Sequence, residues 1–77
     1  MNILIENEET LEFLTESGSW TKDARAGRQF KSRGEALKVA KGEAIGRFNI
    51  VWHILTSNQF VNLDHGRGKG VGEVTPA

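Results

Sequence analysis

Residues 18–36 combine aromatic, small and helix-capping residues in the order that a compact fold needs, and none of them looks like a catalytic group. The clearest local pattern among them is Ser32-Arg-Gly-Glu35, which fits a capping box. In that motif the serine hydroxyl accepts a hydrogen bond from the third helical residue, and the glutamate reaches back toward the cap. We therefore expect a helix from Arg33 to Ala44. Its inward face is formed by small or apolar residues that allow close packing on a sheet: Ala36, Leu37, Ala40 and Ala44.

Short apolar runs on both sides of this helix predict strands. Residues 3–5 and 11–15 are joined by a polar connection and should form an antiparallel hairpin. Residues 48–55 alternate with the period of a strand, and residues 60–63 follow a polar turn as its partner. The chain is thus predicted to be a small α+β domain. We expect an antiparallel sheet of about four strands, in β-β-α-β-β order, with one helix packed on one face.

The segment between the first hairpin and the helix is expected to be mostly irregular. Thr21 is placed to cap a short helical turn over residues 23–26, which Gly27 would end. Phe30 should point into the core from a brief extended piece. Further along the chain, we assign Phe48 and Trp52 to the core and expect His53 to be half exposed.

The length of 77 residues and the hydrophobic fraction of 38% fit one domain with a modest core. Little room is left for an enclosed substrate cavity, which argues against an enzyme. We predict a domain over residues 1–64 and a flexible glycine-rich tail over residues 65–77, where glycines recur at every second position from Gly66 to Gly72.

The chain contains no cysteine, so disulfides and thiol chemistry are excluded and a reducing compartment is favoured. The cytoplasm is therefore the expected location. Residues 1–6 have neither a basic region nor a long apolar run, so we expect no signal peptide and no membrane association.

The formal net charge is zero, but the charges are segregated along the chain. Residues 1–21 carry five glutamates and no base, whereas residues 22–50 carry eight bases against three acids. Either an acidic hairpin lies beside a basic helix and the two balance each other, or a basic side faces an acidic partner such as nucleic acid. The candidate contact residues for a partner or for nucleic acid are Trp20, Arg25, Arg28, Lys31, Lys38 and Lys41.

No motif in the chain indicates chemistry. The two histidines, His53 and His65, fall on separate predicted segments, whereas a metal site needs three or four convergent ligands. Residues 66–72 match neither the phosphate-loop pattern nor the dinucleotide fingerprint. No side chain is a credible nucleophile or base with an orienting partner. We predict no catalytic, cofactor-binding or metal-binding residue.

The spacing of several residues resembles a pattern found in short uncharacterised bacterial and phage-encoded proteins. The pattern runs from a Gly-x-Trp-Thr step at Gly18 through Ala-x-x-x-Phe-x-Ser at Ala26 to Ala36, and it covers roughly residues 11–52. The resemblance implies a small α+β fold and no activity.

Together these observations favour a non-enzymatic interaction or accessory protein. It would bind a protein partner or self-associate through a sheet edge or a patch centred on Trp20. The alternative is weak, non-sequence-specific nucleic-acid binding through the basic segment 22–47.

Overall fold

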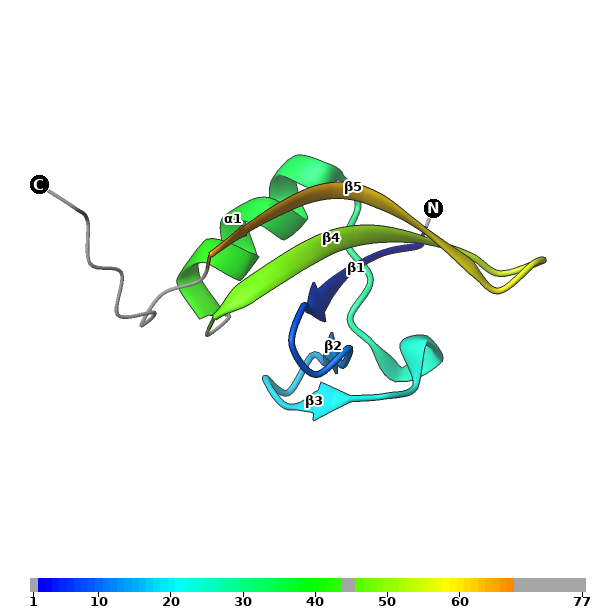
Figure 1. The fold of residues 1–77 in the computed structure, drawn as a ribbon, viewed down its shortest axis with the longest axis horizontal. Helices are drawn as coiled ribbons and strands as arrows, with labels where there is room; N and C mark the ends of the chain where they lie inside the picture. The colour runs from blue at the N-terminus through cyan, green and yellow to red at the C-terminus, as the bar shows by residue number, and fades with distance from the viewer. Residues whose placement is uncertain (1, 44–45, 68–77) are drawn as a thin grey trace, which may run out of the picture.

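A computed structural model describes residues 2–43 and 46–67 of the chain. It contains a five-stranded antiparallel sheet in the order β3-β2-β1-β4-β5, with one helix packed against it (Figure 1). The predicted α+β class and the single helix on one face of the sheet are confirmed. The elements, in chain order, are β1 (Asn2–Asn7), β2 (Phe13–Leu14), β3 (Trp20–Thr21), the 3-10 turn η1 (Ala24–Ala26), α1 (Arg33–Glu43), β4 (Arg47–Ile54) and β5 (Gln59–Arg67).

The strand β3 was not predicted from the sequence. Its two residues pair with β2 because a tight turn closes between Thr15 and Ser19, whose backbone groups are joined by a hydrogen bond of 2.9 Å. The Thr15 hydroxyl also lies 2.8 Å from that of Ser19. This polar turn, in a segment that was expected to be mostly irregular, therefore leads into an edge strand.

Alternation along β1 and β4 divides the core between the two faces of the sheet. Toward α1, Ile3, Ile5, Phe48 and Ile50 pack with the helical alanines Ala36 and Ala40, which are fully buried. A smaller cluster on the opposite face contains Leu4, Phe13 and Val51, with Ala24 packed against it. The close approach predicted from the helical alanines is thus confirmed.

The capping box forms as expected at Ser32, whose hydroxyl accepts the Glu35 N–H at 3.1 Å. The Glu35 carboxylate accepts the N–H of Lys31 at 3.4 Å. The helix then begins at Arg33, as predicted, while Ala44 lies outside the described residues. None of the described helices has the length and apolar character needed to cross a membrane.

The cap of η1 differs from the prediction. Asp23 is the capping residue, because its Oδ1 accepts the Arg25 N–H at 3.0 Å. The Thr21 hydroxyl instead accepts the N–H of Asp23 at 3.1 Å. Gly27 ends the turn as expected, and Phe30 is buried and bridges to Ile3.

The strand β5 is longer than predicted and continues through Arg67, so residues 65–67 of the expected tail are strand. Within this added part, a Cβ at Gly66 would lie 2.9 Å from Cζ of Phe48, so glycine lets the strand pass close to that buried ring. A glycine in this part of the chain therefore serves sheet packing. Residues 68–77 lie outside the described part of the structure. On the preceding strand, Phe48 is fully buried as predicted, whereas Trp52 is only half-buried.

Candidate functional site

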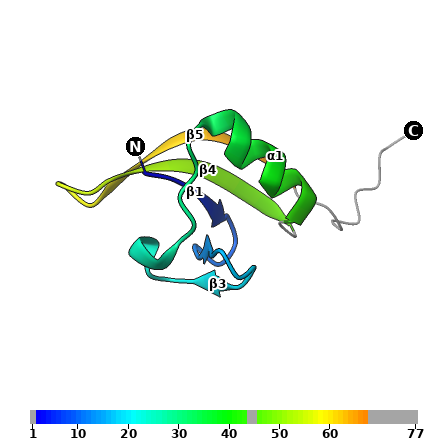
Figure 2. The same cartoon turned by 180° about the vertical axis from the view of Figure 1, so that it is seen from behind.

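The face of the sheet away from α1 is concave. Phe13 on β2 and Phe60 on β5 stack with ring centroids 5.4 Å apart, although β1 and β4 lie between their strands. In a flat sheet, strands three positions apart are separated by about 14 Å. In both views α1 lies on one side of β1, β4 and β5, and the chain from β2 to β3 lies on the other (Figure 1, Figure 2). The sheet therefore curls around the face that α1 leaves open.

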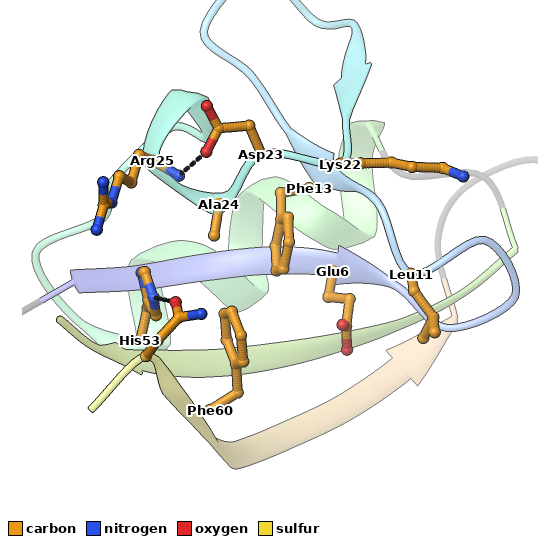
Figure 3. A pocket seen from close by; sticks show the side chains of 10 residues that line it. Glu6, Leu11, Phe13, Lys22, Asp23, Ala24, Arg25, His53 and Phe60 are labelled. Atoms are coloured by element: carbon orange, nitrogen blue, oxygen red, sulfur yellow. Dashed lines mark hydrogen bonds between the residues drawn. The ribbon is translucent and has the colours of Figure 1, made fainter. Parts of the chain in front are cut away.

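A hollow of about 520 Å³ opens on this concave face and is called here the aromatic hollow (Figure 3). The stacked rings of Phe13 and Phe60 stand in the middle of the lining residues, with Ala24 and His53 to one side and Leu11 to the other. Its lining residues are Glu6, Leu11, Phe13, Lys22, Asp23, Ala24, Arg25, His53, Asn58 and Phe60. An apolar centre with charged groups of both signs at the rim suits the side chains of another molecule.

Leu11 has an unusual backbone conformation for its residue type. Its φ is 61°, in the left-handed region that bulky residues rarely occupy, and its side chain is 62% exposed. The turn is held by Asn7, whose carbonyl accepts the Leu11 N–H at 2.8 Å and whose Oδ1 accepts the N–H groups of Glu9 and Thr10. Strain of this kind costs about 1–3 kcal/mol and is concentrated at functional positions. Here it presents an apolar side chain at the end of the aromatic hollow.

His53 forms the wall of the hollow nearest the β4–β5 turn. It is only 2% exposed, so the expectation of a half-exposed side chain is wrong. Phe60 is the partner of His53 in the β4–β5 register and lies over the imidazole, with ring centroids 4.6 Å apart, and Nε2 lies 2.8 Å from Oδ1 of Asn58. Asn58 adopts a φ of 53°, which asparagine tolerates better than most residues. The hydrogen bond between His53 and Asn58 therefore connects the wall of the hollow to the β4–β5 turn.

A second hollow of about 670 Å³, called here the polar hollow, is lined by Glu8, Arg47, Asn49, Asn62, His65, Gly66 and Arg67. A row of side-chain hydrogen bonds connects the two hollows across three strands. Asn62 donates to Oδ1 of Asn49 at 3.3 Å, and Asn49 donates to Oε1 of Glu6 at 3.4 Å. Glu6 lines the aromatic hollow, so the two hollows share one face of the sheet.

The contact residues predicted from the sequence are spread over different parts of the molecule. Arg25 lines the aromatic hollow, whereas Lys38 and Lys41 are exposed on α1, across the sheet from it. The Arg28 guanidinium lies 4.7 Å from the centre of the Phe30 ring. Lys31 is exposed just before the helix, and Trp20 is half-buried against the core on the helix side.

Sequence reasoning did not single out Leu11, Phe60 or Asn58 for the site. Of these three residues, Asn58 could have been identified from its place in a polar turn, because asparagine is favoured where the backbone is left-handed. Leu11 gave no comparable indication, because its leucine side chain does not favour that conformation.

Within the described residues, no group of three or more histidine, cysteine, aspartate or glutamate side chains is arranged to hold a metal ion. Comparisons with protein-family models, with curated proteins and with solved structures find no match to this chain. The resemblance to short bacterial and phage-encoded proteins stays a prediction.

Proposed function

We propose that this chain is a non-enzymatic binding protein that holds an extended segment of a protein partner in the aromatic hollow and along the adjoining edge of β5. The exposed, left-handed Leu11 carries the proposal. A fold that needed only a tight turn would be more stable with glycine or asparagine at this position. We therefore infer that the Leu11 side chain is kept there because it contacts the partner segment in the complex.

The edge of β5 supplies backbone hydrogen-bonding groups beside the hollow. β5 is the last strand of the sheet, and residues 59–62 are exposed. Edge strands present N–H and C=O groups that can pair with an added strand, and peptide-binding domains use this mode of recognition. Phe60, which is 42% exposed, belongs both to this edge and to the hollow.

The rest of β5 is less suited to pairing. The register with β4 shifts between Ile50 and Val51, so Leu63 has no partner there. The Asp64 carboxylate accepts the N–H of His65 at 2.8 Å. Bulges and local capping of this kind interrupt an edge. The open stretch of four residues, about 13 Å long, suits a short segment of a partner better than a symmetric pairing of two copies.

The residues that line the aromatic hollow indicate which side chains the bound partner segment should carry. An apolar side chain would pack against the exposed Leu11 and Phe60, beside the stacked Phe13 ring, and polar flanks would meet Lys22, Asp23 and Arg25 at the rim. Because both signs of charge are present at the rim, the affinity should fall more when the apolar anchor is removed than when the salt concentration is raised. As part of the same proposal we assign the protein to the cytoplasm, in keeping with its lack of cysteine.

Selection of random displayed peptides against the labelled protein tests the proposal. Selected peptides should bind the wild type and the matched control Lys38→Gln equally, because Lys38 lies on α1. They should bind Leu11→Asn about tenfold more weakly or worse, since the apolar anchor is lost while asparagine accepts the left-handed backbone. Equal binding to wild type and Leu11→Asn, or failure to select any peptide, would contradict the proposal.

Two further measurements separate the alternatives. Sedimentation that shows a wild-type dimer and a monomeric Leu11→Asn variant would replace the partner segment with a second copy of the chain. Oligonucleotide binding that weakens steeply with salt and is lost in Lys38→Gln would instead favour nucleic-acid binding through residues 22–47.

A further inference from the structure

The backbone N–H and C=O groups of β1 alternate between the two sides of the strand, and two hydrogen bonds define the alternation. The carbonyl of Ile3 accepts the N–H of Phe30 at 2.9 Å, on the side of β1 away from β4. The N–H of Asn7 donates to the carbonyl of Glu12 at 2.7 Å on the same side, where β2 lies. Consecutive residues of a strand point these groups to opposite sides. The even-numbered residues of β1 therefore point theirs toward β4.

The same alternation extends across the sheet to the outer edge of β5. Val51 is paired with an even-numbered residue of β1, so its backbone groups point back toward β1, and those of Trp52 point toward β5. Val61 is the partner of Trp52 and points its groups toward β4. The residues on either side of Val61, which are Phe60 and Asn62, must then point theirs away from β4. Since β5 is the last strand of the described sheet, these groups face its outer edge.

The residues whose backbone groups face the edge also place their side chains on the concave face. Phe60 lines the aromatic hollow, and Asn62 is paired with Val51, which belongs to the core cluster on that face. The side chain of Val61 lies between them on the opposite face, which carries α1. In a strand added along this edge, the residues opposite Phe60 and Asn62 would lie on the concave face, and the residue opposite Val61 would lie on the helix side.

On the helix side, a row of apolar side chains crosses three strands and ends at Val61. Ile3, Trp52 and Val61 are paired in turn, and their exposure rises toward the edge. Ile3 is 2% exposed, Trp52 is half-buried and Val61 is 41% exposed. The turn end of the β4–β5 hairpin extends beyond α1 in both views (Figure 1, Figure 2). A β-branched apolar residue opposite Val61 would continue the row, because such side chains pack well on a pleated surface.

On the concave face, a row of polar side chains ends at Asn62. Its amide donates to Oδ1 of Asn49 at 3.3 Å, and Asn49 donates to Oε1 of Glu6 at 3.4 Å. The amide oxygen of Asn62 has two lone pairs that can accept hydrogen bonds. An amide or hydroxyl side chain opposite Asn62 would extend this row by donating to that oxygen.

We infer that the partner segment pairs antiparallel with residues 59–62. From its amino end it carries an amide or hydroxyl residue, a β-branched apolar residue and a large apolar residue, opposite Asn62, Val61 and Phe60. This inference rests on the function proposed above and specifies the direction and sequence of the segment. In the antiparallel arrangement, three consecutive partner residues engage all the edge-facing groups of Phe60 and Asn62. A parallel segment would need two further residues to do so, which suits the short open stretch less well.

Methylation of single backbone nitrogens in a synthetic peptide tests the direction. The probe is the capped heptapeptide Thr-Ser-Asn-Val-Phe-Thr-Ser, titrated into isotope-labelled protein and followed by NMR. In the antiparallel arrangement the N–H groups of its Asn and Phe face β5, and that of its Val faces away. Methylation at the Asn or the Phe should weaken binding about tenfold, whereas methylation at the Val should leave it unchanged. The reverse pattern would indicate a parallel segment and overturn the inference.

Matched changes in the protein and the peptide test the sequence preference. Asn62→Ala should weaken the parent peptide about two- to tenfold. It should leave a peptide with Ala in place of Asn unchanged, because that hydrogen bond is already absent. Val61→Thr should weaken the parent peptide about two- to fivefold, and it should affect a peptide with Ser in place of Val less. Lys38→Gln on α1 is the control and should bind as the wild type does.

Two results would overturn the inference and leave the proposed function standing. In the first, the peptide binds the wild type and loses affinity for Leu11→Asn, yet methylation at each of its three central residues has the same effect. In the second, the peptides selected against the protein depend on Leu11 but lack this order of side chains. A protein that binds no peptide at all would contradict both the inference and the proposed function.

Discussion

The rings of Phe13 and Phe60 stack at 5.4 Å with an interplanar angle of 18°, across a sheet in which two other strands separate them. This contact links the short β2 to the edge strand β5 on the concave face. It also connects the stability of the fold to the shape of the aromatic hollow, since both rings line it.

A double-mutant cycle on the two rings should measure this link. Phe13→Leu and Phe60→Leu should each destabilise the protein, and the coupling between them should be about 0.5–1.5 kcal/mol, the usual strength of an aromatic pair. Urea denaturation followed by circular dichroism gives the four free energies of unfolding. The pair Phe13→Leu with Val61→Thr is the control, because Val61 is paired with Trp52 and lies on the other face of β5. Additive effects for Phe13 and Phe60 would show that the stack contributes little.

Asn58 has two roles that substitution can separate. Asn58→Gly keeps a residue that accepts the φ of 53° but removes the partner of the buried His53 ring, so it should cost about 1–2 kcal/mol. Asn58→Ala should cost about 1 kcal/mol more, because alanine is strained in the left-handed region. Thermal denaturation should therefore rank the wild type above Asn58→Gly, and Asn58→Gly above Asn58→Ala. Equal losses for the two variants would assign the whole effect to the side chain.

Two glycine-to-alanine changes should act in opposite directions. Gly66→Ala places a Cβ 2.9 Å from the fully buried Phe48 ring and should destabilise the protein by about 1–3 kcal/mol. Gly42→Ala has open space within 4 Å and lies on the exposed surface of α1, so it should stabilise by about 0.5 kcal/mol. Chemical denaturation of both variants checks the signs. A neutral Gly66→Ala would mean that Phe48 can move aside.

The capping box of α1 should contribute measurably to stability. Ser32→Ala removes the acceptor of the Glu35 N–H and should lower the free energy of unfolding by about 1 kcal/mol. Ser32→Asp should retain most of the wild-type stability, because aspartate also caps helices and favours the positive end of the helix dipole. Helix content and urea midpoint report the result, and equal losses in both variants would argue against capping as the cause.

Several elements could be predicted because local interactions determine them. The helix start follows from Ser32 and Glu35, and the pairing of the first two strands follows from their apolar runs. The concave site could not be predicted in this way. Its central contact joins residues 13 and 60, and neither residue has a neighbour in the sequence that indicates the other.

The sequence by itself determined the class of fold, the position of the helix and the burial of Phe30 and Phe48, because periodicity and capping act over a few residues. Only the tertiary structure decided that His53 is enclosed, that Leu11 stands exposed at a hollow, and that Arg47 faces Arg67. These features depend on the curl and the register of the sheet, which are set by contacts between strands far apart in the chain.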